Sequence, residues 1–160
     1  MENIVYQPIG LIHSPFTQTE GMPIQPSGRA TAPGRVEVLP AFAAGLADLD
    51  GFSHIILLYH FHRAQDARLT VVPFLDDKPH GVFATRAPTR PNPIGLSVVE
   101  LLRRQDNVLH IANIDVVDGT PLLDIKPYVP AFDAAQVTHL GWLEGSSADV
   151  GKKRADGRFK

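Results

Sequence analysis

Proline and glycine interrupt this 160-residue chain so often that no long helix fits between them. There are 14 prolines and 13 glycines, spread along the whole sequence. Proline disrupts helices and central strands, so the short apolar runs between these residues favour strands joined by turns. We expect about eight strands, at the spacing of a barrel or a sandwich. They cover residues 4–12, 34–39, 52–62, 67–73, 81–85, 95–103, 108–116 and 122–128, with a short helix at 41–49.

The length suits one domain, which we place at residues 1–143, followed by a basic C-terminal tail at residues 144–160. The formal net charge of −2 is uneven, because residues 151–160 carry +4 and the remainder carries −6. A basic tail can bind nucleic-acid phosphates, but terminal charge clusters are also often simply solvated. Both interpretations remain open for the tail.

The absence of cysteine excludes disulfides, thiolate nucleophiles and cysteine-ligated zinc. The N-terminal residues MENIVYQPIG do not have the pattern of a signal peptide, and the longest apolar run is too short to cross a bilayer. We therefore expect a cytoplasmic protein that does not associate with a membrane. The sequence lacks the motifs of P-loop NTPases, Rossmann enzymes, ordinary serine hydrolases and HExxH metalloproteases.

The segment 81–95, GVFATRAPTRPNPIG, is predicted to be a ligand-binding loop. Its three prolines stiffen the backbone that carries Arg86, Arg90 and Asn92, which lowers the entropy lost when a ligand binds. Guanidinium groups bind carboxylates or phosphates in bidentate fashion, and Gly95 permits a tight turn or a close approach. The alternative is a surface loop whose arginines contact only water or neighbouring aspartates.

The segment 115–128, DVVDGTPLLDIKPY, combines a turn at Asp118-Gly119 with a strand that carries charge. A period of two predicts one face with Leu122, Asp124, Lys126 and Tyr128, and another with Leu123, Ile125 and Pro127. In a functional interpretation, Asp118 and Asp124 accept hydrogen bonds from a ligand. In the alternative, this is a solvent-exposed face with an ion pair between neighbours.

Histidines recur along the apolar run 52–62, FSHIILLYHFH. His60 and His62 have the spacing of two metal ligands on a strand, but a metal-dependent hydrolase would need a third ligand nearby. The other interpretation gives one histidine a structural hydrogen bond and the other a place in a pocket. In the proline-rich loop 22–28, backbone carbonyls beside prolines could accept hydrogen bonds from an adenine edge.

Taken together, these segments resemble the TsaA-like family, also called YaeB-like or TrmO. The similarity covers about residues 7–130 and is most specific in GVFATRAPTRPNPIGLSVVEL and IDVVDGTPLLDIKPYVP. The resemblance implies an all-β fold: a compact antiparallel β-barrel that binds S-adenosylmethionine (SAM) and forms a homodimer. It also implies N-methylation of threonylcarbamoyl-adenosine beside the anticodon of tRNA. Bacterial tRNA-methylating members carry a further C-terminal domain, whereas only about thirty residues follow Tyr128 here.

The resemblance also implies which residues form the sites. Contacts to SAM are implied for Gln25, Pro26, Ser27, Phe61, His62, Arg86, Leu96, Asp118, Gly119, Thr120, Pro121 and Asp124. Three further motif positions, Arg90, Asn92 and Lys126, are assigned to the substrate.

Methyl transfer from a sulfonium is an in-line displacement that needs neither a metal nor a covalent nucleophile, so we expect no metal. The substrate nitrogen must lose its proton, and Asp118, Asp124 and His62 are the candidates to accept it. Two alternatives from other functional classes remain: a SAM-binding regulatory module without catalysis, and the metal-dependent hydrolase that uses His60 and His62.

Overall fold

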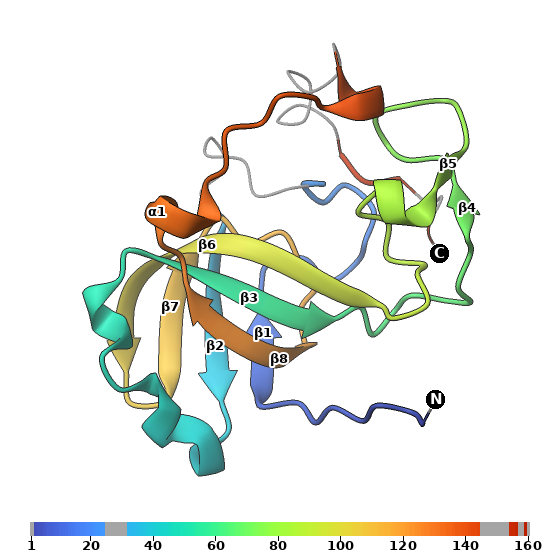
Figure 1. Cartoon of the computed structure of the whole chain (residues 1–160). Helices are drawn as coiled ribbons and strands as arrows, with labels where there is room; N and C mark the ends of the chain where they lie inside the picture. The colour runs from blue at the N-terminus through green and yellow to red at the C-terminus, as the bar shows by residue number, and fades with distance from the viewer. Residues whose placement is uncertain (1, 25–31, 145–153, 157–158, 160) are drawn as a thin grey trace.

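The computed structural model describes residues 2–24, 32–144, 154–156 and 159. Six strands form a closed antiparallel barrel in the order β1-β2-β7-β6-β3-β8 (Figure 1). Their bounds are β1 Gly10–His13, β2 Pro33–Val38, β3 His54–His60, β6 Ile94–Gln105, β7 Val108–Ala112 and β8 Thr120–Pro127. The predicted antiparallel barrel is confirmed, although it has six strands instead of about eight.

The other two strands pair only with each other. They are β4 (Thr70–Val71) and β5 (His80–Gly81), and both lie in the long connection between β3 and β6. The short helices are the 3₁₀ turns η1 (Pro40–Leu46), η2 (Leu49–Gly51), η3 (Val82–Ala84) and η4 (Gly141–Leu143), and one turn of α-helix, α1 (Pro130–Asp133). No helix among the described residues has the length and apolar character needed to cross a bilayer.

Two predicted elements differ from the structure for identifiable reasons. The strand expected at 81–85 is wrong, because the chain turns into η3 after Gly81. Both the backbone N–H and the hydroxyl of Thr85 donate to the carbonyl of Val82, which closes that turn. The strand expected at 4–12 is shorter than predicted, because ladder pairing with β2 and β8 begins only at Gly10.

The barrel core follows the alternation of the strands. Ile55, Leu57 and Tyr59 of β3 are buried, whereas His54 and His60 on the other face are exposed. Burying each large aliphatic side chain stabilises the fold by roughly 1.5–3 kcal/mol. Branched residues from every barrel strand therefore fill the interior and hold the strand ends in place.

A bulge in β8 overturns the prediction that Leu122, Asp124 and Lys126 share a face. Leu58 pairs with Asp124 but Tyr59 pairs with Leu122, so β8 has one extra residue at this point. Leu122 and Ile125, three positions apart, consequently both pack in the core. Asp124 and Lys126 form an ion pair of 2.7 Å between partly exposed side chains, as the solvent-face alternative anticipated.

The antiparallel order gives the barrel two different mouths (Figure 1). We call one the site mouth: β1, β3 and β7 end there, and the connections 61–93 and 113–119 lie over it, together with the described residues 14–24 of the connection after β1. We call the other the capped mouth, where η1, η2 and the tight turn between β6 and β7 lie. At the capped mouth Leu46 is buried, and Phe42 and Leu49 pack against the core.

Candidate ligand-binding site

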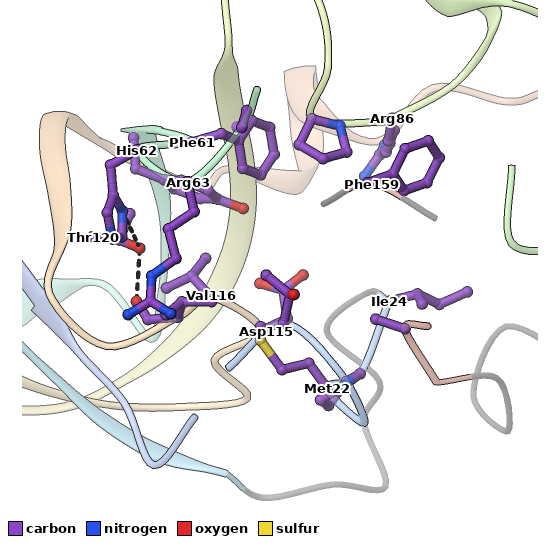
Figure 2. A pocket seen from close by; sticks show the side chains of 18 of the residues that line it. Met22, Ile24, Phe61, His62, Arg63, Arg86, Asp115, Val116, Thr120 and Phe159 are labelled. Atoms are coloured by element: carbon purple, nitrogen blue, oxygen red, sulfur yellow. Dashed lines mark hydrogen bonds between the residues drawn. The ribbon is translucent and has the colours of Figure 1, made fainter. Parts of the chain in front are cut away.

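A cavity of about 330 Å³ opens at the site mouth. This volume lies in the range of roughly 300–1,000 Å³ that is typical of small-molecule sites. Its wall is mainly apolar, with Met22, Phe61 and Leu96 among the lining residues, and it also includes Arg86 and Asp115. Figure 2 shows His62, Arg63 and Thr120 on one side of the cavity, Arg86 and Phe159 on the other, and Asp115 between them.

Residues from the C-terminal end of the chain form one wall of this cavity. The N–H of Gly21 donates to the carbonyl of Ala155, and the N–H of Ala155 donates to the carbonyl of Met22, both at 2.9 Å. The ring of Phe159 meets that of Phe74 edge-on at 5.0 Å. These described residues of the predicted tail thus lie against the pocket. The basic residues Lys152, Lys153, Arg158 and Lys160 lie outside the described part of the chain.

A chain of three polar side chains runs from the barrel interior to the cavity. The hydroxyl of Ser97 donates to Oδ1 of Asp115 at 2.5 Å. The phenol oxygen of Tyr59 lies 2.9 Å from the same serine oxygen. A serine hydroxyl has one proton, so a Ser97 that donates to Asp115 accepts from Tyr59. The direction of donation is therefore Tyr59 to Ser97 to Asp115.

Burial sets the protonation of this chain. It raises the pKa of Asp115 to about 6, and the hydrogen bond from Ser97 and the charge of Arg86 oppose the rise. Burial, together with the charge of Asp115, also raises the pKa of Tyr59 well above its ordinary value. Tyr59 is thus a neutral donor at physiological pH, whereas Asp115 can exchange a proton close to neutrality.

His62 lies on the other side of the cavity, beyond the end of β3. Its Nδ1 is 3.5 Å from Oγ1 of Thr120, which in turn donates to the carbonyl of Val117 at 2.6 Å (Figure 2). Burial lowers the pKa of His62, and the charges of Arg63 and His60 lower it further. His62 is therefore neutral at physiological pH and can act as an acceptor or a donor.

Gly95 is the position opposite Tyr59 in the ladder between β3 and β6. A Cβ at this position would overlap the ring of Tyr59 and crowd the ring of Phe61. The close approach predicted for Gly95 is thus made by Tyr59 itself. This packing holds the phenol against Ser97, so the glycine shapes the polar chain indirectly.

The site mouth brings together about half of the described residues that were predicted to bind SAM or the substrate. Phe61, His62, Arg86, Arg90, Leu96 and Thr120 line the cavity. The described cavity lining does not include Asn92, Asp118, Gly119, Pro121, Asp124 or Lys126, whose roles stay predictions. Gln25, Pro26 and Ser27 lie outside the described residues.

Asp118 has a structural role at this mouth. Its carboxylate accepts the N–H of Ser14 at 3.1 Å and lies 3.3 Å from Nδ1 of His13. Its own N–H donates to the carbonyl of Phe16 at 2.7 Å. These contacts fasten the connection between β7 and β8 to the segment that follows β1, and so they position the cavity wall.

Sequence reasoning missed Asp115, Ser97 and Tyr59 as a unit. Asp115 is a lone carboxylate between the apolar Ile114 and Val116, and Ser97 interrupts an otherwise apolar inward-facing row of β6. A polar residue in a buried row was the available signal, because such groups need a partner. That Ser97 and Asp115 are partners of each other follows only from closure of the barrel.

The structure offers no support for the metal-dependent hydrolase. Within the residues it describes, no group of three or more histidine, aspartate or glutamate side chains is placed to hold a metal ion. His60 is exposed on the outer face of β3, whereas His62 lines the cavity. Among the described residues, the two histidines therefore have no third ligand, which this alternative requires.

Comparison with known proteins gives consistent matches. The sequence model of the family described as "tRNA-methyltransferase O N-terminal domain" matches residues 11–134. A Pyrococcus abyssi protein named "Probable S-adenosyl-L-methionine-binding protein" is 56% identical over 156 residues, which cover 98% of this chain and 85% of that protein.

Two further matches are to longer proteins. The tRNA (adenine(37)-N6)-methyltransferase of Escherichia coli K12 is 37% identical over 140 residues, which cover 81% of this chain and 60% of that enzyme. The crystal structure of TrmO from Pseudomonas aeruginosa superposes with a TM-score of 0.74 at 40% identity, covering 88% of this chain and 63% of that one. The chain thus spans about three fifths of the length of these two proteins.

Proposed function

Because the chain belongs to the tRNA-methyltransferase O N-terminal domain family, we propose that it transfers a methyl group from SAM to N6 of adenosine 37 in tRNA. We further propose that the accepting nucleoside is threonylcarbamoyl-adenosine and that the active form is a homodimer. The observation that carries the proposal is the apolar cavity at the site mouth, which contains a carboxylate and a guanidinium.

The residues around the cavity fit SAM in chemical character. The apolar side chains of Phe61, Leu96 and Met22 suit the adenosine and the methyl group. The guanidinium of Arg86 suits the carboxylate of the methionine portion, since arginine binds carboxylates in bidentate fashion. The negative carboxylate of Asp115 can lie near the positive sulfonium, whereas a positive arginine would repel it.

SAM supplies an electrophilic methyl group, and the protein contributes positioning and a mainly apolar site. The positive charge of the sulfonium spreads out as the methyl group moves, so a mainly apolar cavity favours the transition state. The stiff segment 81–95 and the barrel strands hold the lining residues at fixed distances. Such pre-organisation can supply a large share of the rate of a two-substrate reaction.

Arginines at the opening of the cavity suit an RNA substrate. Arg63 is exposed and donates to the carbonyl of Thr17 at 2.9 Å, while Arg90 donates to the carbonyl of Thr85 at 3.3 Å. Both line the cavity, where they can reach phosphates or the carboxylate of a threonylcarbamoyl group. Asn92 and Lys126 remain proposed substrate contacts on the resemblance alone.

Methylation of tRNA tests the proposal. Total tRNA would be incubated with the protein and methyl-labelled SAM, digested to nucleosides and analysed by mass spectrometry. We expect label only in threonylcarbamoyl-adenosine, and none with tRNA from cells that cannot make this nucleoside. Label in unmodified adenosine would show that the substrate is adenosine itself, while the reaction would still be methyl transfer from SAM to tRNA.

A SAM-binding module without catalysis is the second candidate, because the name of the Pyrococcus abyssi relative records binding alone. Calorimetry with SAM separates the two functions. Binding of SAM without methylation of any tRNA would support the module, and methylation would exclude it.

A further inference from the structure

The hydrogen-bonded chain of Tyr59, Ser97 and Asp115 is not explained by cofactor binding alone. Tyr59 and Ser97 are 3% and 1% exposed, yet they lead to a carboxylate that borders the cavity. In Figure 2 the Asp115 carboxylate projects into the cavity, between the His62 side and the Arg86 side. A carboxylate has about four acceptor sites, and the hydrogen bond from Ser97 occupies one of them.

The proposed reaction needs a proton acceptor at this place. The N6 lone pair of an adenosine, and still more that of its threonylcarbamoyl derivative, is delocalised into the ring and the carbonyl group. Such a nitrogen becomes a good nucleophile only as its proton leaves. A proton acceptor works best when its pKa is close to the working pH. Burial raises the pKa of Asp115 to about 6, which brings it close to neutral pH.

Resting on the proposed function, we propose that Asp115 is the general base of the methyl transfer and that Ser97 and Tyr59 are its positioning residues. The N6 lone pair forms the new bond to the methyl carbon, and the bond from that carbon to sulfur breaks. Its electron pair stays on sulfur, which becomes a neutral thioether. The proton of N6 passes to the carboxylate of Asp115, which becomes a neutral carboxylic acid.

The surrounding charges are consistent with this role. The positive charge of Arg86 and the hydroxyl of Ser97 favour the ionised carboxylate, whereas burial opposes it. Tyr59 is neutral, and the other ionisable groups of the cavity lining are His62, Arg63, Arg90 and Asp156. Most of these are cationic or neutral, so Asp115 can stay ionised at neutral pH beside an uncharged substrate nitrogen.

Two roles compete for Asp115: a base that touches N6, and an anion that only binds the positive portions of SAM. The variant Asp115→Asn separates them, because it keeps the shape and removes the proton acceptor. Asp106→Asn is the matched control, since Asp106 lies in the turn between β6 and β7 at the capped mouth. Asp106 has a φ of 54°, and asparagine tolerates this conformation well.

Single-turnover methylation of tRNA is the measurement. For Asp115→Asn we expect a rate more than tenfold lower, on the order of 10²-fold, with SAM affinity within about threefold of wild type. Asp106→Asn should match wild type in both the methylation rate and the affinity for SAM. A fall of less than tenfold in Asp115→Asn overturns the inference, and so does a loss of SAM affinity that accounts for the whole fall at saturating tRNA.

The pH dependence tests the same inference without relying on that variant. The wild-type single-turnover rate should fall as the pH drops through about 6, since a protonated Asp115 cannot accept a proton. Ser97→Ala removes a hydrogen bond to the ionised form, so its profile should shift to higher pH. A wild-type rate independent of pH between about 5 and 8, or a Ser97→Ala profile that does not shift, contradicts the assignment.

The proposed function and this inference can fail separately. A wild-type protein that methylates no tRNA contradicts the function. If wild type and Asp115→Asn methylate tRNA at similar rates, only the assignment of Asp115 as the general base is contradicted.

Discussion

The two mouths of the barrel are built from the same six strands and closed in opposite ways. At the capped mouth the connections are 3₁₀ turns and a tight turn, and Leu46 fills the end of the core. At the site mouth three longer connections leave a cavity that contains Arg86 and Asp115. Stability and ligand binding therefore depend on separate ends of one core, so substitutions at one mouth should affect one property more than the other.

The largest effect is expected at the capped mouth. Leu46 is 3% exposed, and Leu46→Ala should lower the free energy of unfolding by about 3 kcal/mol through lost burial and a cavity. Urea denaturation measures this change. SAM affinity, measured by calorimetry on the folded variant, should stay close to wild type, and a large loss of affinity would show that the mouths are coupled.

The next largest effect is expected at the site mouth. Arg86→Ala should weaken SAM binding by about 10²-fold from a wild-type dissociation constant on the order of micromolar, because a charge-assisted contact is lost. The free energy of unfolding should change much less than for Leu46→Ala. Calorimetry that gives equal affinities for wild type and variant would remove Arg86 from the cofactor site.

A pH-dependent effect on the order of 2–3 kcal/mol is expected from Asp115. Burial raises its pKa from the ordinary 3.8 to about 6 in the folded protein. Between these values the folded state holds a proton that the unfolded state has lost, so stability rises as the pH falls from about 6 to 4. Urea denaturation measures the free energies of unfolding of wild type and Asp115→Asn. The difference between them should change across this pH window and be constant above it.

The smallest effect is expected from Arg104, the matched arginine at the capped mouth. It donates to the carbonyls of Leu46 and Asp106, both at 2.9 Å, and lies 3.5 Å from a carboxylate oxygen of Asp50. Arg104→Ala should destabilise the fold by about 1 kcal/mol and leave SAM binding unchanged. A weakening as strong as that of Arg86→Ala would indicate a general effect of lost positive charge.

Local patterns were sufficient to predict the strands and one wall of the site. The run 52–62 contains β3, because alternation and branched side chains dictate a half-buried strand. The prolines and arginines of 81–95 marked the segment that supplies Arg86 and Arg90 to the cavity. Both signals are carried by neighbours in sequence.

The features that the sequence did not reveal depend on distant contacts. The bulge in β8 appears only when β8 pairs with β3, and it reverses the expected face of Leu122. The chain of Tyr59, Ser97 and Asp115 joins β3, β6 and the segment after β7, which meet because the barrel closes. No hydrophobic period or motif within one segment predicts a hydrogen bond between such distant segments.

Hydrogen–deuterium exchange with and without SAM tests the difference between the mouths most directly. We expect SAM to slow amide exchange in the connections of the site mouth, at residues 61–64, 86–96 and 113–120. Exchange at the capped mouth, at residues 39–53 and 105–108, should stay unchanged. Protection confined to the capped mouth, or protection at neither mouth under saturating SAM, would contradict it.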